Sequence, residues 1–377
     1  MKKILIINKY FYPGYKAGGP IQSLKNMCDA LQNDFSINIL TWDRDYMDEK
    51  NYDGIEVNSW SNINNYKVFY AKDKIIDSNV ILKAVEDTKP DLIYLNSFFD
   101  KISIDSIKVA RKLDIPIVLA LRGEFSAGAL QIKKLKKKVF LTLAKIMGIY
   151  KNITYHATNE MEKKDIQNIM GKVPILVSEN FVKKPFESID AKDYHDEIKL
   201  VYISRVTPKK NLLFLLDVFR GLKISKKIIL DIYGPVDDSN YWEKCKNTLG
   251  KIDKKNICIT YRGPISPNKF EETYIDTHFS ILPTLGENFG HSIYESLAHG
   301  IPVIVSDQTP WRNLENKKAG FDIKLEKKEF INAFGKLDKM SSEEYNEYSK
   351  GAISLANEYY NSLDIKSLKN AFRKVMR

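Results

Sequence analysis

The chain has 377 residues, with 59 lysines and arginines against 48 aspartates and glutamates, so its formal net charge is +11. At roughly 150 residues per domain, this length predicts two domains and excludes a single small module. Apolar residues make up 44% and charged residues 28%, which is typical of a globular protein and unlike a disordered or collagen-like chain. The cysteines at 28, 245 and 258 form no CxxC pair, so neither a disulfide framework nor a structural zinc site is expected.

The apolar runs are short throughout the chain. None reaches the roughly 18 residues that a spanning helix requires. The first run, residues 4–7, is interrupted by Asn8 and Lys9 and is too short for the core of a secretory signal. We therefore predict a buried first strand here and a cytoplasmic protein.

In the first half, β-branched apolar runs alternate with segments of helical spacing. The runs lie at 3–8, 36–41, 91–96, 116–121, 153–158 and 173–178. Two apolar stripes between them predict helices: Ile21, Leu24, Cys28 and Leu31, and then Ile75, Val80, Leu82 and Val85. Strands that are apolar on both faces and separated by helices indicate a parallel sheet covered on both sides, which is a doubly wound α/β fold.

After Asn180 the pattern changes and then restarts. Residues 181–197 are polar, contain a proline and lack periodicity, which predicts a linker. New strand-like runs follow at 199–204, 227–234, 256–263, 278–283 and 301–306. We predict an N-terminal Rossmann-like domain, 1–180, joined by the C-terminal helix 362–377, and a second Rossmann-like domain, 198–361. Open α/β sheets bind ligands at the carboxyl ends of their strands, so we expect a site in a cleft between these domains.

The most informative segment, residues 282–307, reads as strand end, glycine loop, helix, glycine stop and strand. Gly290 is expected to open the helix, and Gly300 lies just past its end, where glycine suits a left-handed cap. Glu287 precedes the helix and Glu295 lies one to two turns inside it, and eight helical residues rise about 12 Å. A helix N-terminus between two carboxylates is suited to a phosphate group.

This geometry fits a nucleotide diphosphate sugar. Glu295 would accept hydrogen bonds from ribose hydroxyls, Glu287 would hold sugar hydroxyls, and the amides of residues 289–292 would face the phosphates. Two glutamates eight positions apart are, on their own, more typical of surface charge. The surrounding glycines and prolines make the pattern specific.

A second element, residues 202–212, places Arg205 at a strand end and Lys210 in the first turn that follows. A guanidinium fork and a compact ammonium together can neutralise a pyrophosphate leaving group. Spacing does not distinguish Lys209 from Lys210. In a chain this basic, Arg205 and either lysine can also be ordinary surface charges.

Together these elements resemble the family-4 retaining glycosyltransferases, the glycosyl transferases group 1, which have the GT-B architecture of two Rossmann-like domains. Glu287 with Glu295 matches the family's Glu-x7-Glu motif, and Arg205 with Lys210 matches its basic pair. The glycine-rich first loop is matched by AGGPIQSL at 17–24. The segments at 156–166, 178–180 and 300–307 are also similar to the family.

The resemblance implies a metal-independent transferase with no cofactor. It would move a hexose from a nucleotide diphosphate sugar to a glycan or a polyprenyl-diphosphate-linked acceptor, with retention of configuration, in surface polysaccharide biosynthesis. The implied catalytic residues are Glu287, Arg205 and Lys210. The implied donor-binding residues are Gly18, Gly19, Arg122, Glu287, Asn288, Phe289, Gly290, His291 and Glu295.

One position departs from the common pattern. Many family members carry a histidine after the strand that matches 116–121, where this chain has Arg122, although an Arg-Gly version occurs in a subset. Arg122 can hold a phosphate or the acceptor, but it cannot act as a base because its guanidinium stays protonated.

Other classes of function have weaker support. An Asp-x-Asp triplet at Asp43 and Asp45 can hold a divalent metal in the other large glycosyltransferase architecture, but its position predicts a solvated loop. A nucleotide-sugar-binding module without catalysis is the alternative, and the intact Glu287, Glu295, Arg205 and Lys210 set argues against it. The basic charge brings no nucleic-acid-binding motif with it, so nucleic acid is not an expected partner.

A basic amphipathic helix is predicted at 131–151. Its apolar residues are Ile132, Leu135, Val139, Leu143 and Ile146, and its first half is crowded by Lys133, Lys134, Lys136, Lys137 and Lys138. Such a helix can contact an anionic membrane peripherally, at the inner face of the plasma membrane. The alternative, which we favour over insertion, places the apolar stripe on the sheet and the lysines in water.

Overall fold

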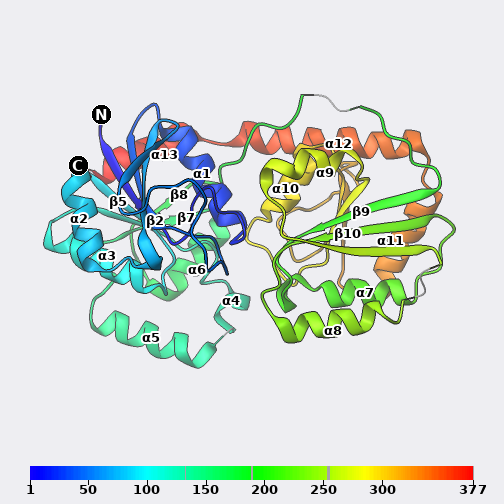
Figure 1. The fold of residues 1–377 in the computed structure, drawn as a ribbon, viewed down its shortest axis with the longest axis horizontal. Helices are drawn as coiled ribbons and strands as arrows, with labels where there is room; N and C mark the ends of the chain where they lie inside the picture. Colours follow the sequence, from blue (N-terminus) through cyan, green and yellow to red (C-terminus); the bar gives the residue numbers. More distant parts are fainter. Residues whose placement is uncertain (132, 188–189, 253–254, 377) are drawn as a thin grey trace. The chain divides into compact units, whose positions relative to one another are not determined.

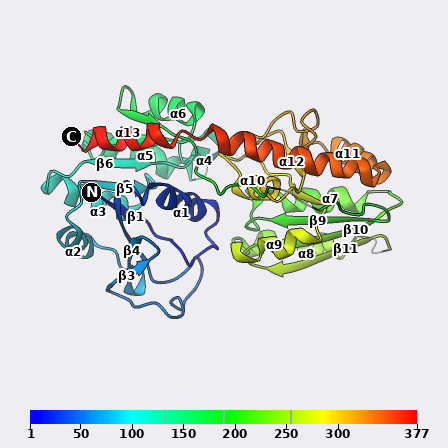
Figure 2. The same ribbon diagram turned by 90° about the horizontal axis from the view of Figure 1, so that it is seen from above.

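The computed structural model describes residues 1–131, 133–187, 190–252 and 255–376 (Figure 1). Its contacts divide the chain into two compact units. Unit 1 comprises Met1–Val182 and Leu363–Arg377, and unit 2 comprises Lys183–Ser362. Figure 2 shows the C-terminal helix beside the strands of unit 1, although it comes from the far end of the sequence.

The sheet of unit 1 has eight strands in its described residues, in the order β3-β4-β2-β1-β5-β6-β7-β8. The strands are β1 (Lys3–Ile7), β2 (Ser36–Trp42), β3 (Trp60–Ile63), β4 (Tyr66–Ala71), β5 (Leu92–Asn96), β6 (Ile117–Ala120), β7 (Thr154–Ala157) and β8 (Ile175–Val177). Neighbouring strands are parallel, except that β3 and β4 form an antiparallel pair at one edge.

Helices cover both faces of this sheet. They are α1 (Gly19–Leu31), α2 (Ser78–Thr88), α3 (Lys101–Lys112), α4 (Ala127–Gln131), α5 (Lys134–Ile146), α6 (Glu160–Met170) and α13 (Ile365–Val375). The side chains of β1 alternate between two cores. Leu5 and Ile7 pack with α2, α3 and α6, whereas Ile4 and Ile6 pack with α1 and α13. This period of two is what a strand buried on both faces requires.

The first predicted helical stripe is confirmed, and the second is partly wrong. Ile21, Leu24, Cys28 and Leu31 are all buried on α1. In the second segment, α2 begins only after Asp77, whose carboxylate accepts hydrogen bonds from the backbone N–H groups of Asn79 and Val80. Ile75 therefore lies before the helix and is exposed, and the buried stripe of α2 is Ile81, Ala84, Val85 and Thr88.

The sheet of unit 2 has six parallel strands in its described residues, in the order β11-β10-β9-β12-β13-β14. The strands are β9 (Glu197–Ile203), β10 (Lys227–Tyr233), β11 (Ile257–Gly263), β12 (Phe279–Leu282), β13 (Val303–Ser306) and β14 (Gly320–Ile323). The helices are α7 (Leu212–Arg220), α8 (Ser239–Leu249), α9 (Phe270–Ile275), α10 (His291–Ala298), α11 (Lys327–Lys339) and α12 (Ser342–Ser362). The predicted fold class, two doubly wound Rossmann-like α/β domains, is confirmed.

The segment predicted as a linker, 181–197, packs on the units near both of its ends. Phe181 and Val182 are buried in unit 1. Tyr194 is buried in unit 2, where its ring stacks on that of Tyr345 with centroids 5.1 Å apart. Residues 188–189 of this segment, and Arg377 of the predicted C-terminal helix, lie outside the described residues. Across the described residues, no helix combines the length and the apolar character needed to cross a membrane.

Candidate active site

The predicted site residues of unit 2 lie on loops at one edge of its sheet and on the helix α10 that follows one of them. Arg205 follows β9, and Glu287 lies between β12 and α10. Because the strands are parallel, their carboxyl ends meet at this edge, where α/β sheets bind ligands. Chain segments about 80 positions apart in the sequence can therefore form one site.

Backbone hydrogen bonds join the glycine loop to the turn that carries the lysines, the 3₁₀ turn η2 (Pro208–Lys210). The N–H of Leu285 donates to the carbonyl of Lys209 at 2.8 Å, and the Thr284 hydroxyl donates to the same carbonyl at 3.2 Å. The N–H of Glu287 donates to the carbonyl of Gln308, after β13, at 3.0 Å. Loops after three different strands are thus fastened to one another.

Lys210 and Glu287 form an ion pair, with Lys210 Nζ 2.5 Å from Glu287 Oε1. The Lys210 and Glu287 side chains are 17% and 10% exposed, so the pair is partly shielded but open to a ligand. Of the two lysines that spacing left equivalent, Lys210 makes the ion pair, although the charges of Glu287, Lys210 and Arg205 also act on the ammonium of Lys209. Lys210 presents its ammonium to the glycine loop, and Lys209 contributes its backbone carbonyl.

Arg205 is paired with a residue that the sequence analysis did not single out. Arg205 Nη1 lies 2.9 Å from Asp237 Oδ2, on the loop after β10. The other oxygen of Asp237, Oδ1, is buried and has no hydrogen-bond partner among the described residues. The sequence signal that could have identified Asp237 is its position just after the Gly234–Pro235 turn, at the end of a predicted strand. Its partner, 32 positions away, could not be inferred from spacing.

Helix α10 begins as the sequence predicts. Gly290 precedes its first residue with φ of 83°, in the left-handed region, and the N–H groups of Ile293 and Tyr294 donate to its carbonyl. The left-handed conformation favours glycine here, and a Cβ on Gly290 would also lie 2.7 Å from Ile293 Cδ1, so the Ile293 side chain would have to shift. The backbone N–H groups of the first turn of a helix are left without intrahelical acceptors, which suits them to an anion.

The remaining loop residues frame this turn. Phe289 is buried, and its carbonyl accepts a hydrogen bond from Trp311 Nε1 at 2.6 Å. The His291 ring meets the Phe289 ring edge-on, with centroids 4.8 Å apart. Asn288 lies half-buried between Glu287 and Phe289. The structure thus places Asn288, Phe289, Gly290 and His291 together around the start of α10.

Glu295 lies apart from the Lys210–Glu287 pair, in the second turn of α10. Its side chain is buried, and this burial raises the pKa of the carboxyl from 4.5 to about 7, which the nearby Lys183 opposes. The adjacent Tyr294 donates its hydroxyl to the Lys183 carbonyl at 2.7 Å. Protonation of Glu295 is therefore favoured relative to that of an exposed glutamate, and a hydroxyl-rich ligand would favour its ionised form.

The other predicted donor-binding residues belong to unit 1. Gly18 caps α1 with φ of 86°, and Gly19 is the first residue of that helix. A Cβ at Gly18 would meet nothing within 4 Å, so the left-handed conformation, rather than crowding, requires glycine here. The loop is thus open on the side where a Gly18 side chain would project.

Arg122 is the centre of a polar network within unit 1. Its guanidinium donates to Asn96 Oδ1, Ser23 Oγ, Asn180 Oδ1 and the Tyr94 hydroxyl, at 2.8–3.3 Å. The Tyr94 hydroxyl also meets Nδ1 of the buried His156 at 2.7 Å. Burial, followed by the charge of Arg122, lowers the pKa of His156 to about 3. A donor phosphate on Arg122 would have to compete with these partners, a cost that the sequence did not reveal.

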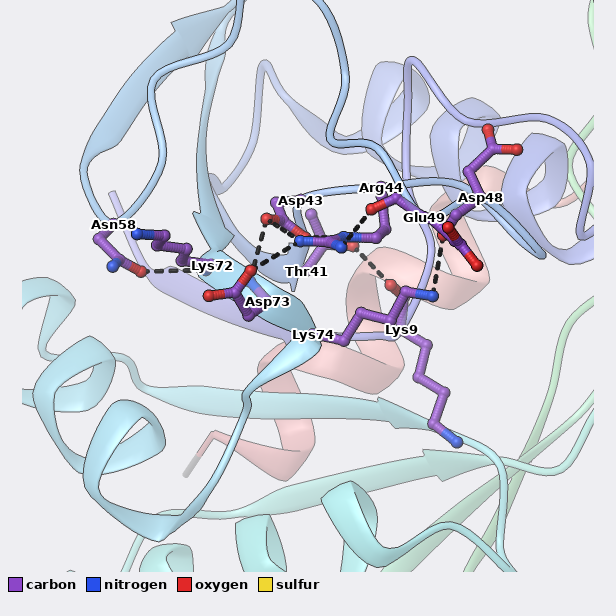
Figure 3. A network of polar contacts seen from close by, with 10 residues as sticks. All are labelled: Lys9, Thr41, Asp43, Arg44, Asp48, Glu49, Asn58, Lys72, Asp73 and Lys74. Carbon is purple, nitrogen blue, oxygen red and sulfur yellow. Dashed lines mark hydrogen bonds and ion pairs between the residues drawn. The ribbon is translucent and has the colours of Figure 1, made fainter.

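Both aspartates of the Asp-x-Asp triplet are buried, so the expectation of a solvated loop is wrong. Figure 3 shows the contacts of Asp43 with Arg44 and Asp73. Asp43 pairs with Arg44, Nε to Oδ1, at 2.8 Å and accepts from the N–H of Asp73 at 3.0 Å, in the turn η1 (Lys72–Lys74). Asp45 accepts from the N–H groups of Tyr15 and Lys16 at 2.7 and 3.0 Å. Both carboxylates thus fasten loops of unit 1. No group of His, Cys, Asp and Glu in the described residues is arranged to hold a metal.

We expect Asp43→Asn to lower the free energy of unfolding by about 1–3 kcal/mol, because Arg44 and the N–H of Asp73 would lose a charged acceptor. Sugar transfer per folded molecule should be unchanged, with or without excess chelator. Urea unfolding and a donor-consumption assay test this. The control is Asp48→Asn, which also removes an aspartate from an ion pair, with Lys16, but at a more exposed position. Loss of transfer that manganese restores would instead assign a metal to the triplet.

Comparison with known proteins agrees with this architecture. The family model described as glycosyl transferases group 1 matches residues 183–352. The chain is similar in structure to sucrose-phosphate synthase (tll1590) from Thermosynechococcus elongatus, with a TM-score of 0.73 at 14% identity over 100% of this chain and 99% of that one. It is also similar to Anabaena Alr3699/HepE solved with UDP and glucose, with a TM-score of 0.66 at 14% identity and the same coverage.

A third solved structure, WaaG, a glycosyltransferase involved in lipopolysaccharide biosynthesis, has a TM-score of 0.65 at 9% identity over 99% of both chains. No curated protein matches the chain in sequence. The family model covers most of unit 2, and the fold match extends over both units. Residues 183–352 therefore match the glycosyl transferases group 1 model, and the chain as a whole has the GT-B fold.

Proposed function

We propose that the chain is a retaining, metal-independent hexosyltransferase that uses a nucleotide diphosphate sugar. Its acceptor would be a glycan or a polyprenyl-diphosphate-linked saccharide in surface polysaccharide biosynthesis. The observation that carries the proposal is the Lys210–Glu287 ion pair, held beside the N-terminus of α10. A cation that can bind the phosphate and a carboxylate that can bind the sugar thus lie on two loops that are hydrogen-bonded to each other.

In this proposal the protein supplies positive charge to the departing diphosphate. Lys210, Arg205 and the first-turn N–H groups of α10 would stabilise the charge that grows on the β-phosphate as the bond to the sugar breaks. Groups fixed in place before the reaction are effective because they need no reorganisation in the transition state. The hydrogen bonds between the loops and the Arg205–Asp237 pair support such preorganisation.

The carboxylates would orient the donor. Glu287 would accept from sugar hydroxyls while it aligns Lys210, and Glu295 would accept from the ribose. The acceptor oxygen then bonds to the anomeric carbon on the face from which the diphosphate leaves, and the acceptor proton leaves with the diphosphate. The configuration is thereby retained. In unit 1, Gly18, Gly19 and Arg122 remain proposed donor contacts.

A uridine nucleotide and glucose are the first donor components to test, because HepE was solved with UDP and glucose. Calorimetry should detect UDP or GDP binding at micromolar concentration, and a thermal-shift panel of nucleotide sugars should identify the donor. NMR of the product should then show the donor's anomeric configuration. Binding without turnover on any acceptor would support the inactive binding module, and absence of nucleotide binding would overturn the proposal.

Asp237 should act as a positioning residue for Arg205. We expect Asp237→Asn to lower kcat about tenfold while nucleotide affinity and the KM for the donor change less than threefold, because Arg205 would lose its ionic partner. Steady-state kinetics and calorimetry give this separation, with Asp217→Asn on α7, an exposed partner of Arg220, as the control. A fall in kcat that is accompanied by a lower melting temperature and by an equal loss of nucleotide affinity would indicate a purely structural role.

A further inference from the structure

Helix α5 has two apolar stripes on opposite faces. Phe140, Leu141 and Ala144 pack against the core of unit 1. The second stripe, formed by Leu135, Val139, Leu143 and Ile146, faces solvent. Leu135 and Ile146 are 75% and 78% exposed, and Val139 and Leu143 are both 52% exposed. Met147, just after the helix, is 71% exposed.

This arrangement corrects the prediction from the sequence. The stripe expected on the sheet is the exposed one, and a second set of apolar residues packs on the sheet in its place. Ile132, the first residue of the predicted stripe, lies outside the described residues. Figure 1 shows α5 at the periphery of unit 1, beyond α3 and next to α4. A row of exposed leucine, valine and isoleucine side chains on one helix is costly in water unless something covers it.

The charge around this stripe has one sign. Residues 125–159 contain no aspartate or glutamate, and their lysines are Lys133, Lys134, Lys136, Lys137, Lys138, Lys145 and Lys151. At 100° per residue, Lys138 borders one side of the exposed stripe and Lys136 borders the other, and Lys134 lies further round, at the exposed start of the helix. Within the described residues, no ion pair involves Lys134, Lys136 or Lys138. Their charge is therefore available to an anionic partner.

The inward side of the helix is fixed by different contacts. Lys137 Nζ donates to the Ala129 carbonyl at 2.8 Å and lies 4.9 Å from the centre of the Phe99 ring, and Lys145 donates to the Ile169 carbonyl. These contacts and the packed stripe anchor α5 to unit 1. The helix therefore presents its exposed stripe without having to leave the domain.

We propose that the exposed face of α5 docks on an anionic lipid bilayer, with the helix lying in the plane of the interface. Leu135, Val139, Leu143 and Ile146 enter the boundary between headgroups and acyl chains, and the flanking lysines contact the anionic headgroups. An apolar stripe bordered by lysines is the pattern of interfacial helices. A second copy of this chain fits less well, because pairing two such faces would oppose their lysines.

The test uses the full-length protein and sedimentation with vesicles of phosphatidylcholine, either alone or with 30% phosphatidylglycerol. We expect at least tenfold tighter binding to the anionic vesicles, weakened by salt. A variant with Leu135, Leu143 and Ile146 changed to Gln should bind at least tenfold more weakly. Changing Lys134, Lys136 and Lys138 to Gln should weaken binding on the order of 100-fold.

The matched control changes Lys244, Lys328 and Lys366 to Gln, which removes the same charge from exposed positions elsewhere. It should retain binding, and all variants should keep the parent melting temperature because the altered side chains are exposed. Equal binding to neutral vesicles, or full binding by the apolar triple variant, would overturn the proposal. So would a concentration-dependent dimer in sedimentation that the apolar variant abolishes. Sugar transfer is not measured, so the result is independent of the proposed reaction.

Discussion

Replacing Lys210 by glutamine should lower kcat by about 10²–10³-fold. The change removes a cation that the proposal places on the departing diphosphate, and losses of this size follow when one preorganised stabilising group is deleted. Nucleotide affinity should fall less, because the charge on the β-phosphate grows chiefly in the transition state. Initial rates of donor consumption at saturating donor, with calorimetry of UDP binding, measure the two effects.

Two companion variants sharpen this test. Lys209→Gln is the matched control, because the contact of Lys209 with the glycine loop is made by its backbone carbonyl. It should keep kcat within about threefold. Glu287→Gln should reduce turnover more than nucleotide affinity, since it removes both the sugar contact and the partner of Lys210. If Lys210→Gln and Lys209→Gln lost turnover equally, the site would not depend on the ion pair.

Glu295→Gln should make the protein more stable at alkaline pH while it weakens nucleotide binding about tenfold. Burial raises the pKa of Glu295 from 4.5 to about 7. Protonation is therefore favoured in the folded state, and wild-type stability is lost as the pH rises from about 4.5 to about 7. Gln lacks this titration, so the stability difference in favour of the variant should grow by about 2–3 kcal/mol between pH 5 and pH 8.

Urea unfolding at the two pH values measures this difference, and calorimetry measures nucleotide affinity. Glu272→Gln, at an exposed position on α9, is the control and should show neither effect. If the stability difference between Glu295→Gln and wild type were the same at pH 8 as at pH 5, the carboxyl would have to be solvated. Unchanged nucleotide affinity would remove Glu295 from the donor site.

The sequence predicts the strands well because each signal is local. Every apolar run expected to form a strand contains one, since a strand buried on both faces is a continuous run of β-branched and aliphatic residues. Of the three described strands that were missed, two lack this signal, whereas β4, YKVFYA, carries it and was still not identified. The short β3, WSNI, is polar and lies at an edge, and β14, GFDI, begins with glycine and contains a charge.

What the sequence does not predict depends on contacts between distant segments. Both stripes of α5 have the same period, so the pattern cannot show which one meets the sheet. The choice between Lys209 and Lys210 needs the position of Glu287, and the pairing of Arg205 needs the loop after β10. The spacing of a motif indicates which residue types share a site. The residues that pair with them and orient their side chains are brought close by the order of the strands in the sheet, which spacing does not reveal.

Unit 1 is completed by residues from both ends of the chain, and this constrains the order in which the protein forms during translation. The ring of Phe372, on α13, meets those of Phe35 and Tyr94, with centroids 6.3 and 5.8 Å apart, and Lys369 and Arg373 pair with Asp34. Until these residues leave the ribosome, the face of the first sheet that α1 and α13 share is covered by α1 alone, although unit 2 precedes α13 in the chain. The unit whose synthesis starts first is therefore completed only after unit 2 has been made, and a nascent chain would need protection of the α13 side of that face until α13 emerges.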